Sequence, residues 1–300
     1  FHVLQQPPVL GPGFAAHEFL STRLLLDVPA GDPPPPEDRA FRAQYGAQQG
    51  ELERQLEADA SVAQVTFSLT DPGGELAAVF EVEGIPAPPD PVAYNIVEGT
   101  KVGRFARFNR IGVDFFDAFR VSVLTGRGFA PGDAAPGVSR ILVNRALVEQ
   151  VFGSENALGR RLRYVGRSRE GDPVHIELGR WYEIVGVVKN FPPKITQADT
   201  TAVIYHAAAP GDVYPATMAI RVRGTSPTAF ADRLRAIGAS VDPNLQLRNV
   251  SSVETTLKQE QGIMRLIAAT LLAVTLSVIV LSAAGIYSLM SFIVARRRRE

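Results

Sequence analysis

Residues 266–295 read LIAATLLAVTLSVIVLSAAGIYSLMSFIVA, thirty consecutive positions without a charged residue. A helix of that length extends about 45 Å, enough for a bilayer together with its headgroup layers. Buried helices of soluble domains are rarely so long and so uniformly apolar. The stretch from Leu266 to Ala295 therefore predicts a membrane-spanning helix, with the lipid bilayer as its partner.

The residues that flank this stretch predict its direction in the membrane. Only Lys258 and Arg265 precede it closely, whereas four consecutive arginines follow it. Cationic residues next to a span are retained on the cytoplasmic side. Residues 296–300 are therefore predicted to be a cytoplasmic end, and nearly everything before the span is predicted to lie outside the cytoplasm. The predicted cytoplasmic anchor consists of Arg296, Arg297, Arg298 and Arg299.

Charge and residue usage exclude several functions. The 31 cations and 31 anions cancel, and removing residues 296–300 leaves 27 cations against 30 anions, a net of −3. Nucleic-acid binding calls for a basic surface, so no nucleic-acid partner is expected. The chain has no cysteine, which excludes disulfides, thiolate metal sites and a cysteine nucleophile.

Motifs for catalysis or cofactor binding are also missing from the sequence. There is no G-x-S-x-G elbow and no phosphate-binding G-x-x-x-x-G-K-S/T loop, and the Gly126-Arg127-Gly128 string is too short for a dinucleotide fingerprint. The histidines do not have metal-ligand spacing. We therefore expect no catalytic, cofactor-binding or metal-binding residue, no cofactor, and a protein that is not an enzyme. The histidines are His2, His17, His175 and His206.

Residues 18–69 are predicted to form a strand, a helix and a second strand. Residues 18–27 and 61–69 have the apolar density of strands, and Asp71-Pro72-Gly73-Gly74 is a strong turn signal. A helix is predicted over 37–59, where Gly46 and Gly50 weaken its middle. Its apolar face follows a 3.6-residue period and comprises Phe41, Tyr45, Leu52 and Leu56.

A second strand-helix-strand unit comes before the span. Strands are predicted over 202–207, 216–223 and 245–250, and Ser226 followed by Pro227 is a favoured helix start. The recurrence predicts one domain split into 17–74 and 200–252, with a β-rich subdomain, 75–199, inserted between the halves. Strands at 75–84, 140–143 and 182–188 and small helices near 114–119 and 144–152 are expected within the insert.

The last helix is predicted to begin before the membrane. Ser251 and Glu254 have capping-box spacing, and only an isolated Gly262 intervenes before the span. Residues 253–295 are therefore predicted to form one stalk and transmembrane helix that couples the outer domain to the membrane. Residues 1–16, rich in proline and glycine, are expected to be a linker after a missing first span, so the chain is expected to be a fragment of a longer membrane protein.

Small residues recur inside the predicted span. Ala269, Ala273 and Ser277 are four positions apart, and Gly285 follows further along. Such spacing lets transmembrane helices pack closely, while chance in an alanine-rich span explains it equally well. The span's hydroxyl groups are expected to bond to their own backbone. These belong to Thr270, Thr275, Ser277 and Ser282.

Several strings resemble, in order, the periplasmic domain of MacB-type permeases. ELERQL at 51–56 with 62–68 resembles its first helix and strand, and FEVEG at 80–84 its next segment. Further similar strings are FFD at 115–117, LTGRGF at 124–129 with Asp133, VNRAL at 143–147, GRRL at 159–162 and YEIVGVV at 182–188. The final span is similar to the start of an FtsX-like permease region, and the glycine-arginine strings also resemble the duplicated orphan permeases. The insert-like segment 166–179 departs from the pattern.

The resemblance implies both a fold and a function. The fold would be α+β: a split porter-like βαβ domain with an inserted β-rich domain, followed by a long transmembrane helix. The protein would be an ABC transporter permease of the bacterial inner membrane, mostly periplasmic. It would act as a dimer with a second permease copy or half, and couple cytoplasmic ATP hydrolysis to efflux or other periplasmic work. A separate ABC ATPase and a periplasmic partner protein are implied partners, and no catalytic residue is implied.

Two other functions fit parts of the sequence. A membrane-anchored extracytoplasmic sensor would also place a large outer domain on a helix, and it predicts a signalling domain after Glu300. An anchored hydrolase lacks any catalytic constellation. Further apolar spans beyond Glu300 and a neighbouring P-loop ATPase would distinguish the permease from both.

Overall fold

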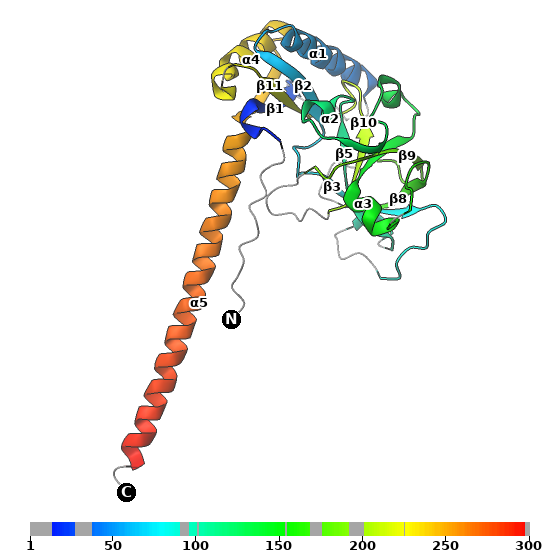
Figure 1. The fold of residues 1–300 in the computed structure, drawn as a ribbon. Helices are drawn as coiled ribbons and strands as arrows, with labels where there is room; N and C mark the ends of the chain where they lie inside the picture. The colour runs from blue at the N-terminus through cyan, green and yellow to red at the C-terminus, as the bar shows by residue number, and fades with distance from the viewer. Residues whose placement is uncertain are drawn as a thin grey trace. The chain divides into compact units, whose positions relative to one another are not determined.

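The computed structural model describes residues 14–27, 38–90, 96–100, 102–153, 155–168, 176–191, 201–224 and 226–297. Contacts within the chain divide it into two units, one ending at Glu254 and the other beginning at Thr255. The first unit is a mixed α+β body and the second is helical (Figure 1). The predicted fold class is confirmed.

One part of the first unit is a four-stranded antiparallel sheet. Its strands, in spatial order, are β2 (Val62–Ser68), β11 (Ala216–Val222), β1 (Phe19–Leu26) and β12 (Leu245–Ser252). Helices α1 (Arg39–Glu57) and α4 (Pro227–Val241) pack against each other and against this sheet (Figure 1). The chain order β1-α1-β2 and β11-α4-β12 gives the two strand-helix-strand units that the sequence predicted.

Local signals explain where the two helices begin. The Asp38 carboxylate accepts hydrogen bonds from the backbone N–H groups of Ala40 and Phe41, and the Ser226 hydroxyl accepts one from Ala229 N–H. The predicted apolar face of α1 is buried, as is the side chain of Gln49. Tyr45 joins this helix to the sheet, because its hydroxyl donates to Leu24 O and accepts from Ala216 N–H.

The other part of the first unit is a closed ring of six strands. In spatial order they are β10 (Val203–Ala207), β7 (Arg140–Asn144), β9 (Trp181–Val188), β8 (Arg161–Ser168), β3 (Leu76–Val82) and β5 (Arg104–Ile111). A parallel pairing between β5 and β10 closes the ring, which leaves these six strands without a free edge. One residue pair, Ser68 opposite Ile111, joins the ring to the four-stranded sheet.

Short elements flank the ring and the four-stranded sheet. Strand β4 (Ile96–Gly99) pairs with β8, and β6 (Val123–Gly126) pairs with β9. The helical elements are η1 (Ala16–Glu18), α2 (Phe115–Ala118), η2 (Pro131–Ala134) and α3 (Arg145–Val151).

An aromatic and polar cluster fills part of the ring's interior. Tyr164 is fully buried, and its hydroxyl lies 2.8 Å from Nε2 of the buried His206. Phe108 and Tyr182 pack around this pair. Burial lowers the pKa of His206 to about 3, and the charges of Arg110 and Arg180 act in the same direction. His206 is thus a neutral packed side chain.

Three details differ from the sequence predictions. Residues 202–207 were placed with the split domain, but β10 hydrogen-bonds to β5 and β7 of the ring. All five residues of β10 are buried, so no alternation indicates which sheet it joins. Strands β4, β5 and β8 were not predicted, and β8 extends into the insert-like segment, of which 169–175 lie outside the described residues.

The predicted linker over residues 1–16 is also corrected at its end. Phe14 packs against Phe19, Phe119 and Phe191, with ring centroids 5.0–5.5 Å apart, so residue 14 already belongs to the packed body. Residues 1–13 lie outside the described part of the chain.

Helix α5 (Val253–Arg297) begins directly after β12. The helix therefore begins at Val253, as predicted. Ser251 lies opposite Ser21 in the strand pairing and belongs to β12, whereas the capping-box spacing places it at the helix start. Gly262 lies within the helix, and the predicted absence of a break at this position is confirmed.

Candidate functional site: an apolar helix and an ion-pair clasp

Part of α5 has the properties of a membrane span. By length and composition, the 22 residues Leu266–Tyr287 are apolar enough to cross a membrane, with a mean hydropathy of 2.5. Their side chains are not buried; Leu272 and Leu281 are each 71% exposed. Continuous apolar surface of this kind requires lipid or another protein surface to cover it. Side chains from Ser288 onward, in the remainder of the predicted span, lie outside the described part.

The predicted packing residues of the span all lie in this segment. Ala269, Ala273 and Ser277 advance by about 40° per step around the helix and form one strip, whereas Gly285 lies about 120° from Ala273. The hydroxyls of Thr270, Thr275 and Ser277 donate to the carbonyl oxygens four residues earlier, at 2.8–2.9 Å. The prediction that the hydroxyls bond to their own backbone is confirmed for these three residues and stays a prediction for Ser282. The packing role of the small residues also stays a prediction.

Two of the four predicted anchor arginines fall within the described chain. Arg296 and Arg297 end α5. Their side chains are outside the described part, as are residues 298–300 altogether.

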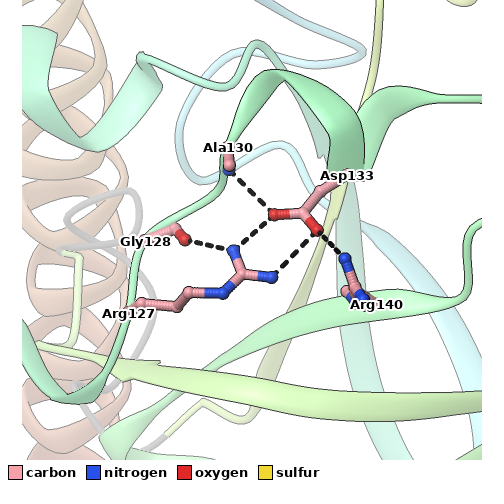
Figure 2. Close-up of polar contacts among 5 residues, drawn as sticks. All are labelled: Arg127, Gly128, Ala130, Asp133 and Arg140. Carbon is pink, nitrogen blue, oxygen red and sulfur yellow. Dashed lines mark hydrogen bonds and ion pairs between the residues drawn. The ribbon is translucent and has the colours of Figure 1, made fainter.

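A second candidate lies in the ring, where the LTGRGF string meets Asp133 (Figure 2). Arg127 follows β6, Asp133 belongs to η2 and Arg140 begins β7. We call these three residues the clasp. Nη1 and Nη2 of Arg127 donate to the two carboxylate oxygens of Asp133 at 2.5 and 3.0 Å, and Arg140 Nη1 donates to Oδ1 at 3.0 Å.

Close backbone contact with β9 positions Arg127. Gly126 lies opposite Gly186 and has a φ of +78°, a conformation that favours glycine. A Cβ on Gly126 would lie 2.4 Å from Val185 O, and one on Gly186 would lie 2.1 Å from Arg127 O. The two glycines therefore let the Arg127 backbone lie directly against β9.

The electrostatics of the clasp indicate a structural role. The Asp133 side chain is 2% exposed, and it also accepts a hydrogen bond from Ala130 N–H at 2.8 Å. The hydrogen bonds from Arg127, with those from Ala130 and Arg140, hold the pKa of Asp133 well below its usual range despite desolvation. A carboxylate so fully bonded stays ionised near neutral pH. It is suited to tying the loop before β7 to the ring and not to exchanging protons.

The described residues contain no group of three or more histidine, aspartate or glutamate side chains placed to hold a metal ion. Of the four histidines, His17 and His206 are in the described part, and His2 and His175 are outside it.

Comparison with known families identifies the first unit. Residues 35–237 match the profile of the MacB-like periplasmic core domain, which covers the chain from before α1 into α4. The chain belongs to the MacB-like ABC transporter permeases. The MacB-like match takes in the whole ring and the clasp. It also assigns a periplasmic domain to this membrane-anchored protein.

Solved structures resemble the chain at low sequence identity. The periplasmic region of MacB from Actinobacillus actinomycetemcomitans is 13% identical, with 85% of this chain and 98% of that chain covered and a TM-score of 0.48. A domain of a putative permease from Porphyromonas gingivalis is 16% identical, with 80% and 94% covered and a TM-score of 0.42. The extracellular domain of the noncanonic ABC-type transporter YknZ from Gram-positive bacteria is 14% identical, with 76% and 100% covered and a TM-score of 0.37. Comparison with curated proteins gave no match.

Proposed function

We propose that this chain is the outer domain and the following membrane helix of an inner-membrane permease that transmits mechanical work. In this role the periplasmic domain couples cytoplasmic ATP hydrolysis to export or other work in the periplasm. The observation that carries the proposal is the course of α5. The helix begins at Val253, directly after the last residue of β12, and stays helical through Gly262 into the apolar segment Leu266–Tyr287. A helix without a linker passes on displacement and torque, because each residue is held by its i→i−4 hydrogen bonds.

The proposal includes partners that this sequence does not itself supply. An ABC ATPase would power the movement, and the proposal assigns it to a separate subunit; residues 1–300 themselves contain no phosphate-binding loop for ATP. A second permease copy or half would pack along the small-residue strip Ala269, Ala273 and Ser277. A periplasmic partner protein, further FtsX-like helices and an efflux role belong to the same proposal, as does an outer domain without enzymatic activity.

The course of α5 can be tested at one position. In the full-length permease with its ATPase in nanodiscs, Gly262→Pro should interrupt the helix, and Gly262→Ala should preserve it. Residues 1–300 contain no cysteine, so Asp232→Cys, at a side chain 96% exposed, can carry a single spin label per copy once any cysteine elsewhere in the full-length permease is replaced. The label-to-label distance should change with ATP in the alanine variant and remain fixed in the proline variant, while both hydrolyse ATP. An equal ATP-dependent change in both variants would exclude transmission through α5.

The predicted orientation has its own test. A membrane-impermeant maleimide should label Asp232→Cys in intact spheroplasts, and a cysteine at Arg297 only after lysis, because cationic flanks stay cytoplasmic. The reverse pattern would overturn the periplasmic placement. A sensor would give the same labelling, but its outer domain would bind a ligand without any ATP-dependent movement.

A further inference from the structure

A cavity of about 740 Å³ lies in the first unit, between the start of β1, the end of β11 and the start of α4. It is within the size range of small-molecule sites in proteins. Its polar lining comes from separate parts of the chain and comprises His17, Glu18, Arg120, Arg221, Arg223 and Ser226. The proposed mechanical role assigns no function to this cavity.

The cavity has more cationic than anionic groups. Three arginines and one glutamate line it, which gives a net charge of +2 before His17 is counted. Glu18 is already paired, since its Oε2 lies 2.6 Å from both Nε and Nη2 of the buried Arg221. Two arginines, Arg120 and Arg223, thus remain without a carboxylate among the described residues.

The two remaining guanidinium groups have most of their hydrogen-bonding capacity available. Among the described residues, the Arg223 guanidinium donates once, from Nη2 to Ala63 O at 3.2 Å. The Arg120 side chain makes no hydrogen bond or ion pair to the residues that the structure describes. Each guanidinium carries five N–H donors in a planar fork that matches phosphate and carboxylate oxygens.

Two further observations indicate that the electrostatic potential in the cavity is positive. Ser226 caps α4, a 15-residue helix whose N-terminal end lies at the cavity and contributes partial positive charge. The Arg221 hydrogen bond, with the charges of Arg120 and His17, lowers the pKa of Glu18 against the effect of desolvation. An anion placed here would meet the same charges.

The cavity also lies at the end of the sheet from which α5 leaves. Arg221 pairs with Phe19 on β1, and the next residue of β1, Leu20, pairs with Ser252, the last residue of β12. A ligand in the cavity would therefore contact Glu18, which directly precedes β1, the strand that pairs with the last residue of β12.

We propose that this cavity binds a phosphate ester, with Arg120 and Arg223 contacting the phosphate oxygens. Arg221 would fix the position of Glu18 in the cavity lining through their ion pair. The volume exceeds that of a bare phosphate ion, so the site accommodates the organic part of the ester as well. A phospholipid headgroup and a soluble phosphate ester share this chemistry. The inference stands independently of the proposed mechanical role.

The test uses the whole 300-residue chain in detergent and glycerol 3-phosphate as the probe, measured by titration calorimetry. Arg120→Gln combined with Arg223→Gln should weaken binding on the order of tenfold or more, because two charge-assisted contacts are removed. The matched control combines Arg145→Gln with Arg235→Gln, two exposed arginines away from the cavity, and should bind as the unmodified chain does. If the double variant melts early, Arg120→Gln alone replaces it, since that side chain makes no hydrogen bond to the described residues.

A competition experiment distinguishes the two sources of phosphate. Short-chain phosphatidylglycerol that displaces glycerol 3-phosphate assigns the cavity to a lipid headgroup, and failure to displace it assigns a soluble ester. Both results keep the proposal. It is overturned if the unmodified chain does not bind glycerol 3-phosphate, or if the control pair loses as much affinity as the cavity pair.

Discussion

Arg127 donates two hydrogen bonds in parallel to Asp133, at 2.5 and 3.0 Å, while the Asp133 side chain is 2% exposed and the Arg127 side chain is 44% exposed. This pairing is asymmetric, because the anion has given up its water and the cation has kept part of its hydration. Loss of the anion would leave Arg127 and Arg140 able to turn toward solvent. Loss of the arginines would leave a buried, unpaired carboxylate, which lowers the free energy of unfolding by more than loss of the anion does.

The burial of Asp133 predicts the effect of removing its charge on the stability of the protein. Asp133→Asn should lower the free energy of unfolding by about 1–3 kcal/mol, because three charge-assisted hydrogen bonds lose the carboxylate while the shape is kept. Urea unfolding of the detergent-solubilised chain, followed through its one tryptophan, Trp181, measures this. Asp232→Asn is the matched control, since its carboxylate is 96% exposed in its pair with Arg235, and it should change stability by less than about 0.5 kcal/mol. Equal effects of the two substitutions would refute a structural role for the clasp.

Two glycines of α1 are predicted to respond oppositely to alanine. A Cβ on Gly46 would lie 2.6 Å from Pro210 O, whereas a Cβ on Gly50 meets nothing within 4 Å. Gly46→Ala should therefore destabilise the protein by about 1–3 kcal/mol through a backbone clash. Gly50→Ala should stabilise it by about 1 kcal/mol, because glycine is unfavourable inside a helix. Urea unfolding followed by circular dichroism compares them, and stabilisation by both would show that α1 is not held against the turn at Pro210.

Glu53 is predicted to make stability depend on pH near neutrality. Burial raises the pKa of Glu53 from 4.5 to about 7, and the charges of Asp114 and Glu57 add to the shift while Gln49 opposes it. Below pH 4.5 the group is protonated in both states. Between 4.5 and 7 the folded state retains the proton that the unfolded state loses, so the free energy of unfolding falls as pH rises and is then constant above 7.

Glu53→Gln should remove this slope and stabilise the protein at pH 8, by up to about 3 kcal/mol. Urea unfolding at several values between pH 5 and 8 measures it. Glu51→Gln on the same helix is the control. Its pKa is lowered to about 2 by hydrogen bonds from Arg54 and Gln55, so both states are ionised throughout this range and the slope should persist. An unchanged slope in the Glu53 variant would contradict its burial as a carboxylic acid.

Helix α1 could be predicted closely from the sequence because its signals are local. The predicted range 37–59 contains the observed Arg39–Glu57, and the apolar face repeats at 3.6 residues after the capping residue Asp38. The start of α4 at Ser226 follows from the same kind of signal. Strand β5 gave no comparable pattern. Its arginines, Arg104, Arg107 and Arg110, recur every three positions, which interrupts the alternation that indicates a strand.

The ring and the two charged groupings depend on contacts between distant residues. Closure of the ring pairs Val203 with Arg107, and no turn or spacing encodes that pairing. The string resemblance pointed to Arg127 and Asp133 but not to Arg140, which reaches the carboxylate only because β7 starts beside η2. The cationic cavity draws on η1, β2, the end of β11 and the residues Arg120 and Ser226, which lie after α2 and before α4, so its residues become a site only in the folded chain.

The strip of small residues in α5 yields a prediction about assembly in the membrane. Ala273 lies in the middle of the strip, and Ala268 lies about 140° away around the helix. Ala273→Ile should weaken self-association of the chain in detergent or nanodiscs by about tenfold or more, because a bulky side chain keeps the two backbones apart. Ala268→Ile makes the same chemical change on another face and should leave association unchanged. Energy transfer between chains labelled at Asp232→Cys, measured against dilution in lipid, gives both dissociation constants. If both variants associate like the parent, the strip reflects the alanine-rich composition of the span, and the second copy must pack elsewhere. If both are weakened equally, the contact is not confined to the face of Ala269, Ala273 and Ser277.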